Sequence, residues 1–203
     1  MISKETLNNE KELLRARMRS LLQRMPPGDF RSHQEVLLSQ KFWRGISTIL
    51  LYSPLPGEPN PVQLMKSNLS CNFFFPRIEG DHLGIYRYEH PCRWRIGPFD
   101  LKEPDPDTWE LVSPEIIDLA LIPGLAFDSS GGRLGRGAGF YDRLLGKSDF
   151  KGLKIGVCWE SQIVSSVPCD AHDIPMDHII SEKSTVTPRQ ISGSGLDKSR
   201  ERE

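Results

Sequence analysis

LIPGLAFDSSGGRLGRGAGFYDRLL is the segment from residue 121 to residue 145, and its pattern changes twice along its length. Its first residues are apolar, its middle is rich in glycine, and its end has the spacing of a short helix. Gly135, Gly137 and Gly139 occupy alternate positions in the glycine-rich part. A strand that leads through a loop into a helix is a building unit of α/β proteins, so this segment indicates an α/β fold.

Short apolar runs on both sides of this segment predict further strands. A capping box, Ser32-His33-Gln34-Glu35, predicts a second helix that runs to about residue 44. Residues 98–114 contain four prolines and five acidic residues, which predicts an ordered loop laid over the sheet. The alternation of elements predicts a single domain with a mostly parallel sheet flanked by helices. Strands are expected at residues 48–52, 71–76, 84–88, 119–122, 153–159 and 178–180, and further helices at 62–67 and 141–145.

An N-terminal amphipathic helix is predicted from about residue 5 to residue 25, where apolar residues recur at helical spacing. Lys11 falls within the apolar stripe of this helix, and two interpretations of it stay open. A lysine at a helix edge can lay its methylene groups along apolar surface and keep its ammonium in water. Alternatively, the ammonium is aimed at an inward site.

Composition excludes several classes of protein. The chain of 203 residues has 26 basic and 27 acidic residues, and a formal charge of −1 gives no overall field to attract nucleic acid or an anionic membrane. The longest stretch without a polar side chain, residues 119–127, is far shorter than the roughly 20 residues of a membrane span. The first residues lack the apolar core of a secretory signal. Because the four cysteines form no C-x-x-C pair, we expect reduced thiols in a cytoplasmic protein. We expect a monomer with one domain over residues 1–188 and a disordered tail over residues 189–203.

The glycine loop has the chemistry of a phosphate-binding loop. Alternate glycines let backbone N–H groups approach phosphate oxygens, and the following helix presents its positive N-terminus to the same place. Arg133 and Arg136 add charge and forked donors. A bare G-x-G-x-G pattern is also typical of a flexible surface turn, and it matches neither the Walker loop nor the dinucleotide fingerprint. The surrounding residues must therefore distinguish a phosphate site from a turn.

Four separated motifs, in the same order, resemble those of the 5-formyltetrahydrofolate cyclo-ligase family, whose members are also called methenyltetrahydrofolate synthetases. Residues 123–142 resemble its P-G-L-x-F-D, R-L-G-x-G-x-G and Y-D motifs, and residues 11–15 resemble its K-x-x-L-R motif. Residues 52–58 resemble its glutamate motif, and residues 172–177 resemble its H-D-x-x-x-D motif. The resemblance extends over about residues 4 to 186. It implies an ATP- and Mg²⁺-dependent ligase that converts 5-formyltetrahydrofolate to 5,10-methenyltetrahydrofolate through a phosphorylated formyl group, with release of ADP and phosphate.

The resemblance also implies roles for individual residues. Lys11 and Arg15 match contacts to ATP. Asp142 and Asp173 match the aspartates that bind Mg²⁺, a plausible pair because this ion takes one or two carboxylates with water and phosphate oxygens. Glu58 matches a folate-binding glutamate, and Ser53 lies near a second substrate position. The part from Arg136 to Phe140 of the ATP loop would also contact the folate, and Arg136 and Tyr141 would serve catalysis. The whole ATP loop would comprise Arg133, Leu134, Gly135, Arg136, Gly137, Ala138, Gly139, Phe140 and Tyr141.

Some positions depart from the family pattern. Phe140 stands where many members have a tyrosine, and Ala138 stands where some have lysine or glycine. Trp94, Phe99 and Trp109 are candidates for stacking on the folate. Two other functions stay open at this point: a paralogue that binds folate or nucleotide without turnover, and an ATP-dependent phosphotransferase with a different acceptor.

Overall fold

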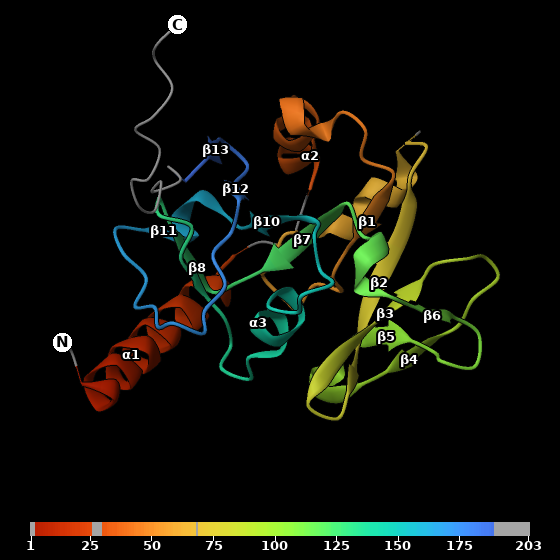
Figure 1. Cartoon of the computed structure of the whole chain (residues 1–203). Coiled ribbons are helices and arrows are strands. Elements are labelled where there is room, and N and C mark those ends of the chain that lie inside the picture. The colour runs from red at the N-terminus through yellow and green to blue at the C-terminus, as the bar shows by residue number, and fades with distance from the viewer. Residues whose placement is uncertain (1–2, 26–29, 68, 189–203) are drawn as a thin grey trace, which may run out of the picture.

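The computed structural model describes residues 3–25, 30–67 and 69–188, and this part of the chain is built around one mixed sheet of eight strands (Figure 1). The five central strands form four parallel pairings, and three antiparallel pairings add the outer strands. The prediction of an α/β fold with a mostly parallel sheet is therefore confirmed. In sheet order the strands are β13 (Thr185–Val186), β12 (His178–Ile180), β10 (Leu153–Val157), β7 (Leu119–Pro123), β1 (Thr48–Leu50), β2 (Asn72–Glu79), β3 (His82–Arg87) and β6 (Glu110–Val112).

Helices cover both faces of this sheet. Side chains alternate between the two faces along a strand, so each buried strand contributes to two cores. On one face, Leu37 of α2 (Arg31–Leu38) joins the core formed by alternate residues of β1 and β7. On the other face, Leu144 of α3 (Phe140–Leu145) joins the core formed by the intervening residues. Single turns of 3-10 helix occur at Lys41–Trp43, Pro98–Asp100, Pro114–Ile116 and Glu160–Gln162, and a longer one at Pro61–Lys66.

The N-terminal helix α1 (Lys4–Leu22) confirms the amphipathic prediction. Ser3 caps it, because its hydroxyl accepts a hydrogen bond from the backbone N–H of Thr6 at 3.1 Å. Its buried residues Met18 and Leu22 pack in a third core with residues of a small second sheet. The strands of that sheet are β8 (Ala126–Asp128), β9 (Arg133–Leu134) and β11 (Ile163–Val164).

The predicted capping box at residues 32–35 is wrong. With Ser32 as the cap the helix would begin at residue 33, but α2 begins two residues earlier, at Arg31, and the residue before it, Phe30, makes no side-chain cap. Phe30 is buried, and the Gln63 side chain accepts a hydrogen bond from its backbone N–H at 3.1 Å. Tertiary contacts therefore fix the start of this helix, which ends at Leu38 instead of continuing to residue 44.

The predicted loop over residues 98–114 is also wrong in part, because the segment contains two strands. Strand β5 (Lys102–Pro104) pairs with β4 (Trp94–Ile96) in a hairpin, and β6 forms an edge of the main sheet through β3. These strands are three residues long and partly exposed, so they lack the apolar run that marks a buried strand. Two of the four prolines, Pro98 and Pro114, begin 3-10 helices.

Three further expectations concern the periphery of the protein. The expected tail, residues 189–203, lies outside the described residues, so the domain boundary near residue 188 stays a prediction. Within the described ranges, no helix combines the length and the apolar character that crossing a membrane requires. All four cysteines are free thiols.

Candidate active site

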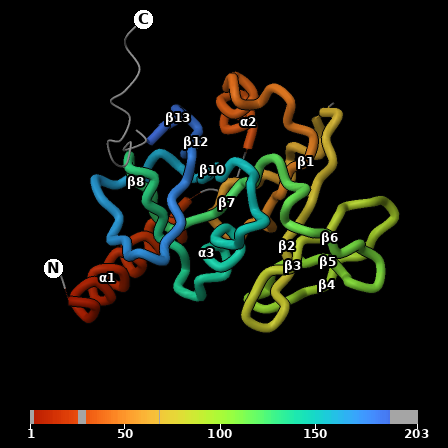
Figure 2. The backbone as a smooth tube through the Cα atoms, in the orientation of Figure 1, coloured from red at the N-terminus to blue at the C-terminus, as the bar shows by residue number. Residues whose placement is uncertain are grey.

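The candidate site lies at the carboxyl ends of β1 and β7, two neighbouring parallel strands. From β1 the chain continues to β2 on one side, and from β7 it continues to β10 on the other side. A crevice forms at such a reversal of strand order, where α/β proteins usually bind ligands. The glycine loop that joins β9 to α3 crosses from α1 to α3 at this edge of the sheet (Figure 2).

Two cavities in the described part of the chain share the glycine loop as a wall. One has a volume of about 470 Å³ and the other of about 430 Å³. Arg133, Gly135, Gly139 and Asp142 line both of them. A ligand in one cavity would therefore lie next to a ligand in the other, with the loop between them.

The larger cavity is mainly apolar, with a few polar groups. The loop after β1 supplies Ser53 and Glu58, the glycine loop supplies Arg136, and α3 supplies Tyr141. A largely apolar cavity of this size with few, fixed polar groups suits a planar ring system. Its apolar lining comes from Leu55, Pro76, Ile78, Leu83, Phe99, Leu101, Ala138 and Phe140.

An ion pair between buried Glu58 and exposed Arg136 orients the polar groups of the larger cavity. Glu58 is only 5% exposed. Its Oε1 accepts hydrogen bonds from the Nη2 of Arg136 at 2.6 Å and from the Nε at 3.2 Å, and its Oε2 accepts one from the backbone N–H of Leu55 at 2.9 Å. Because these donors contact both carboxylate oxygens, the side chain of Glu58 is held in one orientation. It is therefore not a solvated loop acid.

Two tyrosines line the same cavity as neutral phenols. Burial raises the pKa of Tyr141 above its usual range, and the charge of Glu58 raises it further. Burial also raises the pKa of Tyr52, whose hydroxyl donates a hydrogen bond to the carbonyl of Pro59 at 2.8 Å. The phenol of Tyr141 therefore keeps its proton at neutral pH and can act as a hydrogen-bond donor.

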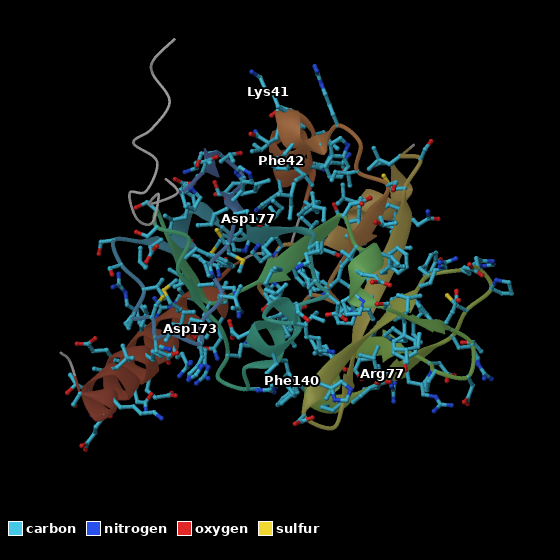
Figure 3. The ribbon with its side chains drawn as sticks, in the orientation of Figure 1. Lys41, Phe42, Arg77, Phe140, Asp173 and Asp177 are labelled. Carbon is cyan, nitrogen blue, oxygen red and sulfur yellow. The ribbon has the colours of Figure 1, made fainter. Side chains whose placement is uncertain are left out.

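The smaller cavity is lined mainly by charged side chains, and Lys11 is central to it. The ammonium of Lys11 donates to Oδ2 of Asp173 at 2.6 Å and to Oδ2 of Asp170 at 3.0 Å. Figure 3 shows Asp173 beside α1. Burial alone would lower the pKa of Lys11, but the hydrogen bonds and charges of the two aspartates outweigh it and raise the pKa above 10.5. Lys11 is only 7% exposed, so it does not snorkel and its side chain points inward, while its role in a binding site stays a prediction.

Three arginines connect the glycine loop to its surroundings. The Nε of Arg15 donates to the carbonyl of Gly135 at 3.0 Å, and the Nη2 of Arg19 donates to the carbonyl of Arg136 at 3.3 Å. Both bonds attach α1 to the loop. Arg133 is buried between the two cavities, and within the described part of the chain its Nε makes no hydrogen bond. This donor is therefore a buried polar atom without a hydrogen-bond partner among the described residues.

Asp142 and Asp173 line the smaller cavity together, although they are far apart in sequence. The Oδ1 of Asp142 accepts from the Nη2 of Arg133 at 2.8 Å and from the backbone N–H of Ile174 at 3.3 Å. The residues from 3 to 188 that the structure describes contain no cluster of three or more metal-ligating side chains. Two carboxylates without a third ligand fit Mg²⁺, which keeps water and phosphate oxygens among its ligands.

The three candidates for ring stacking have different environments. Phe99 is exposed and lines the larger cavity. Trp94 and Trp109 instead contact each other edge to face, with ring centroids 4.7 Å apart, and both also pack on Phe75. Of the three, Phe99 is therefore the residue placed to contact a ligand.

The sequence analysis missed several residues of the site. Arg19 lies one helical turn after Arg15, so the spacing of i and i+4 could have identified it. Asp170 lies three residues before Asp173, but no periodic element marks that segment. Lys102 and Glu103 line the larger cavity from strand β5, which the sequence analysis treated as loop.

The fold and the two cavities define a class of protein: an α/β protein that places a cavity lined by charged side chains next to an apolar one across a glycine loop. The family model for the 5-formyltetrahydrofolate cyclo-ligase family matches residues 6–182, so the chain belongs to this family. It is 33% identical over 146 residues to a 5-formyltetrahydrofolate cyclo-ligase from Mycolicibacterium smegmatis, covering 67% of this chain and 74% of the relative. It is 27% identical over 203 residues to a protein of that name from Mus musculus, covering 88% and 97%.

A solved structure has the same architecture. The NMR structure of a 5,10-methenyltetrahydrofolate synthetase from Aquifex aeolicus superposes with a TM-score of 0.75 at 33% identity, covering 92% of this chain and 96% of that one. The resemblance inferred from the four sequence motifs is therefore confirmed at the level of the family and the fold.

Proposed function

We propose that this protein catalyses the ATP- and Mg²⁺-dependent cyclisation of 5-formyltetrahydrofolate to 5,10-methenyltetrahydrofolate, with release of ADP and phosphate. The observation that carries the proposal is the pair of cavities that share the glycine loop. The smaller cavity, with Lys11, Arg15 and Arg133 in its lining, suits a polyphosphate, and the apolar cavity suits the folate ring system. A phosphoryl donor and its acceptor would then meet at the loop.

The reaction needs ATP for a chemical reason. A formyl group on nitrogen is amide-like, so its carbon is a weak electrophile and its oxygen a poor leaving group. Transfer of the γ-phosphoryl group to the formyl oxygen breaks the bond to ADP and corrects both defects. The neighbouring folate nitrogen then attacks the formyl carbon and loses its proton, and the formyl oxygen departs within the phosphate. The product is the methenyl cation.

The residues of the smaller cavity would bind the polyphosphate. Lys11 and Arg15 line it from α1, and Arg133 lines it from β9, at the start of the loop from residue 133 to residue 141. Asp142 and Asp173 would hold Mg²⁺, which neutralises phosphate charge when it is bound. Because phosphoryl transfer depends mainly on positioning and charge stabilisation, these residues need supply no nucleophile.

The residues of the larger cavity would orient the folate. Glu58 fixes the guanidinium of Arg136 at the wall that faces the ring, and Ser53 lies on the same side. Arg136 would stabilise negative charge on the transferring group, and the phenol of Tyr141 would donate a hydrogen bond near it. Arg133 lines both cavities and would lie between the two ligands. We further propose that the protein works as a cytoplasmic monomer, an arrangement with which its free thiols are consistent.

An activity assay tests the proposal against its alternatives. The purified protein is incubated with ATP, Mg²⁺ and 5-formyltetrahydrofolate, and the methenyl product is followed by its near-ultraviolet absorbance. We expect turnover that requires all three components. Release of ADP without the folate would indicate a phosphotransferase with another acceptor. Binding of both ligands without product would indicate a paralogue that lacks catalysis.

A further inference from the structure

Arg143 makes three contacts on the outside of the larger cavity. It lies in α3 and is exposed. Its Nε donates to the carbonyl of Asp81 at 2.7 Å, and its Nη2 donates to the carbonyl of Ala138 at 2.9 Å. Its guanidinium carbon lies 5.2 Å from the centre of the Phe140 ring, within the range of a cation–π contact. One side chain thus joins two segments that are far apart in sequence.

These two segments form opposite parts of the cavity lining. Asp81 lies at the tip of the hairpin between β2 and β3, whose residues Ile78 and Leu83 line the cavity. Ala138 and Phe140 line it from the glycine loop and the start of α3. Figure 3 shows Phe140 between α3 and the tip of this hairpin. Arg143 therefore holds the hairpin and the glycine loop at a fixed separation.

The backbone of the glycine loop is adapted to this contact. Gly139 has a φ of 68°, in the left-handed region that favours glycine. A β-carbon at this position would lie 2.9 Å from the Nη1 of Arg143, too close for an undisturbed contact. A side chain at residue 139 would therefore displace the arginine as well as strain the backbone.

We propose that Arg143 is a positioning residue for the ring system of the substrate. This inference rests on the proposed function, in which the larger cavity binds the folate. Arg143 lines neither cavity and would touch neither ligand. It acts through the hairpin and through Ala138 and Phe140, and it sets the width of the cavity at the ring. The planar fork of a guanidinium can serve two carbonyls at once, which a lysine ammonium cannot do with the same geometry.

The test compares the kinetics of Arg143→Ala and Arg143→Lys with the wild type. We expect the KM for 5-formyltetrahydrofolate to rise about tenfold in Arg143→Ala, as for the loss of hydrogen bonds from a charged group. The KM for ATP should stay within about twofold of the wild type, because Ala138 and Phe140, which Arg143 contacts, line the larger cavity and not the smaller one. The KM of Arg143→Lys for 5-formyltetrahydrofolate should lie between those of the wild type and Arg143→Ala. Arg17→Ala, at an exposed position in α1, is the matched control and should behave as the wild type.

Each outcome has a distinct meaning. If the wild type produces no methenyl product, the proposed function fails. If the wild type is active and the KM for the folate is unchanged in Arg143→Ala, the inference about Arg143 is overturned. An equal rise of both KM values would also overturn it, because it would indicate a general loosening of the loop. If Arg143→Ala does not fold, as judged by its melting curve, Arg143→Lys decides by the same comparison of KM values.

Discussion

Replacement of Lys11 by methionine isolates the charge of the smaller cavity. Methionine keeps most of the aliphatic volume of the lysine and favours a helix, so α1 should persist. The ammonium is buried and contacts Asp173 at 2.6 Å and Asp170 at 3.0 Å. In the proposed complex this ammonium would also contact a phosphate. The substitution therefore removes one charge-assisted contact to the nucleotide and leaves both aspartates without their cation.

The magnitude follows from that contact. A hydrogen bond to a charged group contributes about 1.5 to 3 kcal/mol, so the affinity for ATP should fall about 10- to 100-fold. The free energy of unfolding should fall by about 1 to 2 kcal/mol, because both aspartates remain partly hydrated when their cation is lost. The raised pKa of Lys11 means that its ion pairs are complete below pH 10.5 and are lost as the pH rises through the folded-state pKa. Between pH 6 and pH 9 the contribution of Lys11 should therefore be constant.

Isothermal titration calorimetry with a non-hydrolysable ATP analogue and Mg²⁺ measures this effect. Lys4→Met is the control, because Lys4 is an exposed residue of the same helix. An unchanged dissociation constant in Lys11→Met would refute the reasoning. Lys11 would then be an internal counter-ion of the two aspartates and not a ligand of the nucleotide.

Asp142→Asn and Asp173→Asn should each lose most of the turnover and require more Mg²⁺ to reach the remaining activity, because both aspartates would bind the same ion. For the same reason, the double mutant should be less impaired than the product of the two single losses. Independent losses in a Mg²⁺ titration would show that the two aspartates have separate roles. Glu58→Gln should raise the KM for 5-formyltetrahydrofolate about tenfold, because it removes the charge that orients Arg136, and an unchanged steady-state KM would argue against that role. Burial raises the pKa of Glu103, which is 3% exposed, so its ionisation opposes folding as the pH rises. Glu103→Gln should therefore stabilise the protein more at pH 7 than at pH 4 in urea unfolding, and an advantage independent of pH would contradict this.

Local sequence patterns were sufficient for the elements that depend on local chemistry. The glycine loop was predicted because strand, glycines and helix follow one another in one segment. A charge in an apolar stripe is unusual, which marks Lys11 in the sequence, and its burial excludes the snorkelling interpretation. The central strands were found because strands buried on both faces form continuous apolar runs.

The remaining features depend on contacts between distant segments. Lys11 pairs with Asp170, 159 residues away, and no pattern near either residue indicates the other. Arg143 contacts backbone carbonyls, which any residue could supply. From the sequence, Trp109 is a candidate for stacking on the folate. In the structure it directly precedes β6, which pairs with β3, and its ring packs in an aromatic cluster instead. Strand β5 is too short and too polar to show a period, so its pairing with β4 had no local signal.

The fate of the formyl oxygen tests the proposed mechanism most directly. 5-Formyltetrahydrofolate labelled with ¹⁸O in the formyl group is converted with ATP and Mg²⁺ in a single turnover, and the released phosphate is analysed by mass spectrometry. Transfer of the γ-phosphoryl group to that oxygen predicts one ¹⁸O atom in each phosphate, with one ADP and one methenyl product formed per turnover. Unlabelled phosphate, with the ¹⁸O recovered in water, would contradict the phosphorylated formyl group.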